Sequence, residues 1–389
     1  MFSKNIIFKN FQNILKTNQN KKINNLLKKE IINSSLLLNS LTEKYKYSFT
    51  KKKIKKFKNY KNYNLIGMGG STLGAEAIYD FLNHKIKKNF KFYNNLQSQR
   101  VLKSKIKKVN LIISKSGNTL ETVVNFNLIL KNQKNNKNII ISENKNNYLN
   151  LIAKKLKAEI IEHKNYIGGR YSVLSEVGML PIQLMGLNER KFKRFNYLIK
   201  SKSFINSLIR NVNFIHKNTT IGKTNSIILN YDEKSENLFK WYQQLTAESL
   251  GKKSKGILPV ISSMPKDNHS LLQLYLDGPK DNFFTFFNVF SNKSQKLDNK
   301  NLFNQFSALK NKNISEIIIS QKKATENVFY KKNIPFRSFE LLNRNEETLG
   351  ELFCFFILET ILLGRLLKVN PFDQPSVELI KEETRKILN

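Results

Sequence analysis

The chain has 389 residues, of which 40% are hydrophobic, so it is long enough to bury a large core and to form two domains. Its 67 Lys and Arg residues against 29 Asp and Glu residues give a formal net charge of +38. The lysines are scattered over the whole length among Asn, Ile and Phe, which share A/T-rich codons. We therefore interpret the charge as compositional bias and expect no nucleic-acid partner.

No membrane segment or disulfide is expected. The most apolar run, 352–363, is interrupted by Glu359 and is too short to cross a bilayer. The N-terminus lacks the continuous apolar core and small-residue cleavage site of a signal peptide. The one cysteine, Cys354, lies in an apolar helical pattern, which predicts a buried thiol and a cytoplasmic protein.

In chain order, residues 1–55 are lysine-rich and are predicted to form an N-terminal helical segment. Two series of strand–turn–helix units follow, over 56–204 and 205–389. Strands of the first series are predicted at 62–67, 91–93, 109–114, 138–142 and 159–162. Strands of the second series are predicted at 226–230, 257–261, 283–290 and 335–341, before a helix at 347–367 and a closing helix after Pro375.

Strands that alternate with helices are typical of a parallel sheet covered on both faces. The sequence therefore predicts an α/β fold with two doubly wound parallel-sheet domains of flavodoxin-like topology, with extra N- and C-terminal helices. Ligands of such sheets bind at the carboxyl ends of the strands.

The segment 111–122, LIISKSGNTLET, is the most informative of these strand ends. An apolar strand stops in a turn that contains Ser114, Ser116 and Thr119, and a helix follows. Hydroxyl groups and free backbone N–H groups at a helix N-terminus can hold an anion, which favours a small phosphorylated ligand. An ordinary βα loop with a serine N-cap remains open as an alternative.

Two segments resemble nucleotide-binding motifs but do not match their patterns. In GMGGSTLG, at 67–74, Thr72 stands where a dinucleotide fingerprint needs its third glycine. Around 217–224, Lys217 replaces the leading glycine of a P-loop, and a strand follows instead of a helix. No His, Cys and carboxylate cluster has the spacing of a metal site, so no metal is expected.

Glu248 is the first candidate for chemistry, because it continues the apolar stripe of Leu238, Trp241 and Leu245 at helical spacing. It is expected to face inward in the last helical turn, where a carboxylate can act as a general base. The alternative is a glutamate at the edge of the core, paired to a lysine.

Three more residues are candidates, each with a structural alternative. His269 is expected in the first turn of a helix, partly inward, although it could be a purely structural histidine. Arg170 follows two glycines in IGGRYS and could stabilise an oxyanion or lie in a surface salt bridge. Lys381 could reach back from the last helix, but lysines are abundant here.

Together, seven segments resemble the phosphoglucose isomerase family, and they occur in family order from about Tyr63 to the C-terminus. The segments are GMGGSTLG (67–74), SKSGNTLET (114–122), GGRYSVLSEVGMLP (168–181), WYQQLTAESLGK (241–252), DNHSLLQLYLDGP (267–279), NEETLGELFCFFILET (345–360) and NPFDQPSVELIK (370–381). Residues 1–55 show no such match.

The resemblance implies two sugar-isomerase domains, with the active site between them and usually completed in a homodimer. It implies interconversion of glucose 6-phosphate and fructose 6-phosphate through a cis-enediolate, without metal or organic cofactor. The domain 56–204 would carry the phosphate-binding loop, and 205–389 would carry the catalytic glutamate.

The family's roles also carry over to matching positions. The substrate phosphate would be bound by Ser71, Ser114, Lys115, Ser116 and Thr119, beside the loop backbone of Gly69, Gly70 and Gly169. The resemblance implies that Glu248 moves the proton between C2 and C1 and that Arg170 stabilises the intermediate. His269 and Lys381 would assist ring opening.

Two departures from the family pattern are visible. Ser116 replaces a frequent threonine but keeps the hydroxyl group, whereas Ile380 stands before Lys381 where glycine is usual. Two alternatives stay open: a non-catalytic sugar-phosphate sensor with the same domains, and an isomerase that also accepts mannose 6-phosphate.

Overall fold

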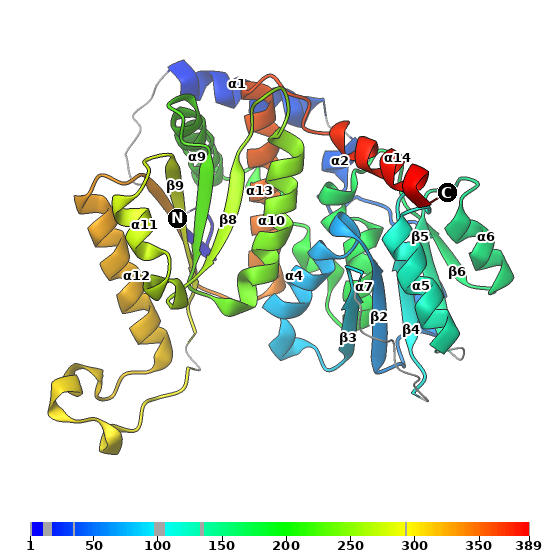
Figure 1. The fold of residues 1–389 in the computed structure, drawn as a ribbon, viewed down its shortest axis with the longest axis horizontal. Helices are drawn as coiled ribbons and strands as arrows, with labels where there is room; N and C mark the ends of the chain where they lie inside the picture. Colours follow the sequence, from blue (N-terminus) through cyan, green and yellow to red (C-terminus); the bar gives the residue numbers. More distant parts are fainter. Residues whose placement is uncertain are drawn as a thin grey trace.

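The computed structural model describes residues 2–10, 18–33, 36–96, 106–132, 136–291 and 294–388, which form two halves, each built around a five-stranded sheet (Figure 1). Helices cover both faces of the sheets, so the predicted α/β class is confirmed.

The first sheet has the strand order β3-β2-β4-β5-β6 and is entirely parallel. Its strands are β2 (Asn62–Gly67), β3 (Asn89–Tyr93), β4 (Val109–Ile113), β5 (Lys137–Ser142) and β6 (Glu159–Glu162). Every residue of β4 is buried, as expected for a central strand whose two faces are both covered. All five predicted strands are present.

The second sheet has the order β1-β10-β9-β7-β8. Its strands are β1 (Ile6–Asn10), β7 (Asn225–Asn230), β8 (Leu258–Ser263), β9 (Asn282–Val289) and β10 (Phe336–Leu341). The four strands predicted in this half are present and parallel, whereas β1 runs antiparallel to β10 at the edge.

The prediction that residues 1–55 are helical is therefore wrong for the strand at Ile6–Asn10. Ile6 is fully buried and Phe8 packs on the core, so this short segment satisfies its backbone hydrogen bonds along the edge of the second sheet. Helices do form further along this region: α1 (Asn18–Ile32), α2 (Leu36–Asn39) and α3 (Lys51–Lys55).

The remaining α-helices connect the strands or close the chain. They are α4 (Leu73–Phe81), α5 (Leu120–Asn132), α6 (Tyr148–Lys155), α7 (Glu176–Met185), α8 (Phe195–Leu198), α9 (Lys202–Thr220), α10 (Glu236–Leu250), α11 (Leu272–Asp277), α12 (Ile314–Lys331), α13 (Glu346–Leu366) and α14 (Ser376–Leu388). Within the described ranges, no helix combines the length and the apolar character that a membrane crossing needs.

Two helices join the halves at the centre of the molecule. Helix α4, from the first half, packs along α10, from the second half (Figure 1). Helix α13 runs through the core with almost every side chain buried, including Cys354, whose predicted burial is confirmed. The fold thus places the carboxyl end of α10 next to the carboxyl ends of the first-sheet strands.

Candidate active site

Two glycine turns meet at the junction of the halves. A Cβ atom on Gly70 would lie 2.2 Å from the backbone C and O atoms of Gly169, so the two loops touch backbone to backbone. Gly69 has φ +53°, and its Cα faces the side chain of Gln244 on α10. A side chain at Gly70 would push the loops apart, and one at Gly69 would also need a left-handed backbone, which explains these two glycines physically.

Arg170 follows this contact in a 3₁₀ turn at Gly169–Leu174. Its side chain is only 2% exposed, and its guanidinium group donates five hydrogen bonds. The acceptors are Ser249 Oγ at 2.7 Å, Glu248 Oε2 at 3.1 Å, Gln374 Oε1 at 2.7 Å, Pro371 O at 2.7 Å and Asp373 O at 3.0 Å. These acceptors come from the second half and the C-terminal segment, so Arg170 ties both halves together.

Glu248 lies in the last turn of α10, where the predicted stripe of Leu238, Trp241 and Leu245 is buried. Glu248 itself keeps 25% of its side chain exposed while it pairs with Arg170 Nη1 at 3.1 Å. It therefore faces a partly open space beside a buried cation. This arrangement suits a group that must reach a substrate.

The hydroxyl-rich loop follows β4 at the same edge of the first sheet. Gly67 lies opposite Ile113 in the β2–β4 register, so the loop that carries Ser71 and the loop that begins at Ser114 leave the sheet side by side. Ser114 is buried, and its Oγ lies 2.8 Å from Thr119 Oγ1, immediately before α5. Exposed hydroxyl and backbone groups of this loop can accept an anion.

Lys115 reaches across this edge. Its Nζ donates to Asn165 O at 2.7 Å and lies 3.6 Å from Glu143 Oε1. Burial lowers the pKa of the Lys115 ammonium, an effect that Glu143 opposes. The lysine thus links the hydroxyl-rich loop to the loop that leads to Gly169 and Arg170.

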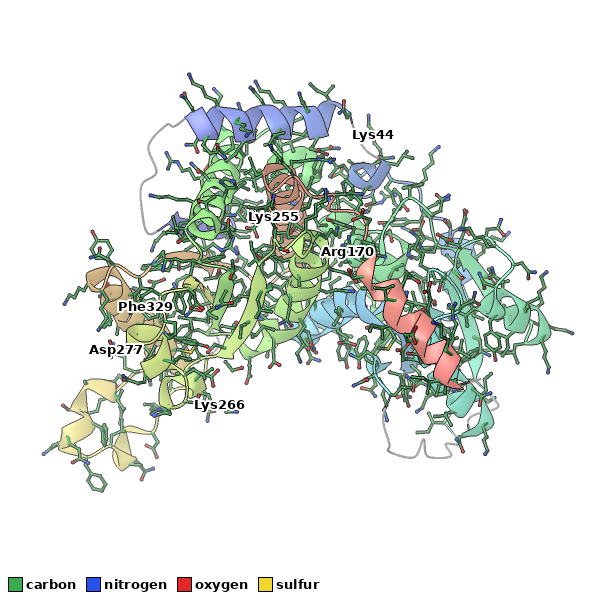
Figure 2. The ribbon with its side chains drawn as sticks, turned by 45° about the horizontal axis from the view of Figure 1, so that its top comes forward. Lys44, Arg170, Lys255, Lys266, Asp277 and Phe329 are labelled. Atoms are coloured by element: carbon green, nitrogen blue, oxygen red, sulfur yellow. The ribbon has the colours of Figure 1, made fainter. Side chains whose placement is uncertain are left out.

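A set of contacts therefore joins the loop that carries Ser71 to Glu248, and the hydroxyl-rich loop leaves the sheet beside that loop. It runs from the first-sheet loops through Gly70 and Gly169 to Arg170, which lies between the two halves (Figure 2). The structure brings together the groups predicted for phosphate binding, proton transfer and charge stabilisation.

His269 lies elsewhere. The prediction that it begins an α-helix and faces partly inward is wrong, because it ends a 3₁₀ turn at Lys266–His269 and is exposed. Figure 2 places Lys266, the first residue of that turn, well away from Arg170. The polar tripeptide before His269 favours a tight surface turn, where Asp267 accepts hydrogen bonds from Ser262 and Ser263.

Lys381 is exposed on the last helix. It lies on α14, which has no buried residue, and its Nζ pairs with Glu378 Oε1 at 2.6 Å on the same helix. In both figures α14 lies on the side of the first sheet, although it follows the second half in the chain.

Three site residues were missed in the sequence reasoning. Gln374 and Ser249 accept hydrogen bonds from Arg170, and Gln244 lies against Gly69 one helical turn before Glu248. Gln244 could have been found because it lies four residues before Glu248, and side chains at this spacing share one face of a helix. In the part of the chain that the structure describes, no three His, Cys, Asp or Glu side chains cluster as metal ligands would.

Comparison with known proteins gives this geometry a context. The family model described as "Phosphoglucose isomerase" matches residues 30–389. A glucose-6-phosphate isomerase from Methanocaldococcus jannaschii is 35% identical, over 81% of this chain and 81% of its own. A probable glucose-6-phosphate isomerase from Methanococcus maripaludis is 33% identical, over 83% of this chain and 78% of its own.

Solved structures agree at the level of the fold. A hypothetical protein from Thermus thermophilus superposes with a TM-score of 0.83 at 23% identity, covering 95% of this chain and 94% of its own. A glucose-6-phosphate isomerase from Chlamydia trachomatis gives 0.75 at 15% identity, covering 99% and 89%. From the match over 30–389 and the relatives above 30% identity, the chain belongs to the phosphoglucose isomerase family.

Proposed function

We propose that the chain catalyses the reversible isomerisation of glucose 6-phosphate and fructose 6-phosphate. The observation that carries this proposal is the direct contact between Glu248 and the buried Arg170 guanidinium group, beside a hydroxyl-rich loop. A sensor needs the loop alone, so the carboxylate–guanidinium pair favours an enzyme. The isomerase names of the relatives support the same substrate class.

Phosphate binding is assigned to the loops at the carboxyl edge of the first sheet. Ser71, Ser114, Ser116 and Thr119 supply hydroxyl groups, and Lys115 supplies positive charge. A grip on the distant phosphate holds the reacting carbons against Glu248, so binding energy is converted into orientation.

Proton transfer is assigned to Glu248 and charge stabilisation to Arg170. Glu248 takes the proton from C2 of the open-chain aldose, which leaves an enediolate with its negative charge on O1. The hydroxyl proton moves from O2 to O1, and Glu248 returns its proton to C1, which gives the ketose. When the carboxylate is protonated, its negative charge passes to the substrate oxygen. Glu248 lies next to Arg170, whose buried and fixed charge would stabilise the negative charge on the carboxylate and then on the substrate oxygen with little reorganisation.

Ring opening remains assigned to His269 and Lys381 as a proposal. His269 is exposed and ends the turn that begins at Lys266, which Figure 2 shows well away from Arg170. We therefore place His269 in the site of a second copy, which makes the active enzyme a homodimer. A cytoplasmic location is also part of the proposal, supported by the reduced, buried Cys354.

The test is a coupled assay on the purified protein. Fructose 6-phosphate is added, and glucose 6-phosphate is followed through a dehydrogenase that reduces NADP. The expected result is steady turnover that needs no added metal or cofactor. Absence of turnover in both directions would refute the proposed function. Parallel rates on mannose 6-phosphate measure the breadth of the substrate range.

A further inference from the structure

The loop between β5 and α6, residues 143–147, supports the hydroxyl-rich loop from behind. The backbone N–H of Glu143 donates to Lys115 O at 3.0 Å, and that of Leu149 donates to Gly117 O at 3.1 Å. The hydroxyl-rich loop is therefore bonded to the start of the supporting loop and to α6, the helix that follows it. Any shift of the supporting loop would move the groups that face the phosphate.

Asn147 fixes the middle of this contact. A Cβ atom on Gly117 would lie 2.1 Å from Asn147 Oδ1, so the amide sits directly against the turn. Its Nδ2 donates to Ser142 Oγ at 3.1 Å and to Glu143 O at 3.3 Å. The amide thus holds the supporting loop in one arrangement beneath Gly117.

Glu143 is the charged member of the supporting loop, and only 10% of its side chain is exposed. Its Oε1 lies 3.6 Å from Lys115 Nζ, and its Oε2 lies 2.7 Å from Lys145 Nζ. Burial disfavours the Lys115 ammonium, and the neighbouring carboxylate counteracts that effect. Glu143 therefore orients the Lys115 side chain and favours its charged form.

We propose that Glu143 is a positioning residue for phosphate binding, which holds the charged Lys115 side chain at the edge of the hydroxyl-rich loop. The ligand class is a phosphate monoester, and the inference rests on the proposed function. Glu143 does not touch the sugar. It acts through Lys115 and affects substrate capture rather than proton transfer.

The first test compares Glu143→Gln with wild type in the coupled assay. The amide has nearly the same size but no charge, so KM for fructose 6-phosphate should rise about tenfold, while kcat stays within about twofold. The inhibition constant of inorganic phosphate should rise by the same factor as KM. Glu162→Gln is the matched control, because Glu162 lies on the neighbouring strand and pairs with Lys164 instead; its KM should equal that of wild type.

The second test asks whether Glu143 acts through Lys115. In a Lys115→Met background, adding Glu143→Gln should leave KM unchanged. An equal rise of KM in both backgrounds, an unchanged KM in the single variant, or a fall in kcat alone would overturn the proposal. If Glu143→Gln does not fold, Glu143→Asp keeps the charge but withdraws it from Lys115, and should raise KM in the same direction.

Calorimetric titration with inorganic phosphate separates this proposal from the proposed function. A wild-type protein that binds phosphate but turns over no sugar would refute the isomerase, and weaker phosphate binding by Glu143→Gln than by this protein would still support the Glu143 inference. Phosphate binding that is equally strong in wild type and Glu143→Gln would refute the inference even if the protein is an active isomerase.

Discussion

Replacing Arg170 by lysine keeps the positive charge between the two halves but removes the planar fork that spans them. The guanidinium group donates five hydrogen bonds to five acceptors. A lysine ammonium has three donors at one point, so at least two acceptors lose their partner.

The size of the effect follows from those lost bonds. Of the five acceptors, those on Ser249 and Pro371 lie in buried hydrogen bonds, and an unpaired buried acceptor costs about 1–3 kcal/mol. The free energy of unfolding should therefore fall by up to roughly 6 kcal/mol. The charge also moves away from the position of the enediolate oxygen, and kcat should fall about 100-fold to 1000-fold, as for loss of an oxyanion donor. Stability and turnover should therefore fall together.

Urea unfolding followed by tryptophan fluorescence, together with the coupled assay, measures both effects. Arg365→Lys is the matched control, because Arg365 is 38% exposed and contacts Glu30; its unfolding free energy should change by less than about 1 kcal/mol. An Arg170→Lys protein as stable and as active as wild type would refute the assigned role of the five bonds.

Three further predictions follow from single residues. Glu248→Gln should keep substrate binding but lower kcat by about 100-fold to 10,000-fold; retained turnover would remove Glu248 as the base. Gly117→Ala should raise KM strongly, because its Cβ would collide with Asn147 at a position with φ +71°. The control is Gly186→Ala, which has φ +91° but no atom within 4 Å of the added Cβ; it should lower stability without changing KM. Burial raises the pKa of Glu76 from 4.5 to about 7, so between these pH values the native state binds a proton that the unfolded state has lost. This proton binding stabilises the native state, and the stabilisation is lost as the pH rises through this range. Glu76→Gln should therefore be stabilising at pH 8 relative to wild type, by on the order of 3 kcal/mol, and nearly neutral at pH 4.5; equal differences at both pH values would contradict this.

Local sequence patterns predicted most of the fold, because the strands of both sheets are short apolar runs between turns. The strand at Ile6–Asn10 was not predicted from the sequence. Its lysine-rich surroundings are typical of exposed helices, and only pairing with β10, far along the chain, makes it a strand. Tertiary pairing of this kind overrides local propensity.

The site residues that lie in local sequence patterns could be predicted, whereas those that depend on contacts between distant segments could not. The stripe before Glu248 and the glycines before Arg170 are local patterns, and the structure brings both residues together at the junction of the halves. The Arg170 acceptors on the C-terminal segment, such as Gln374, depend on packing between distant segments. The spacing of apolar residues along the sequence does not indicate such contacts. The positions of His269 and Lys381 likewise depend on how exposed elements pack, which an amphipathic pattern does not specify.

The pairing of β1 with β10 also has a consequence for the order in which the molecule can assemble. Ile6 lies opposite Leu341, so during synthesis the first strand emerges long before its partner exists. The first sheet can close from residues near one another in the chain, but the second sheet gains its edge strand only when nearly the whole polypeptide is present. Closing so long a loop is slow. The apolar N-terminal segment must therefore wait unpaired, and its docking is expected to be one of the last steps of folding.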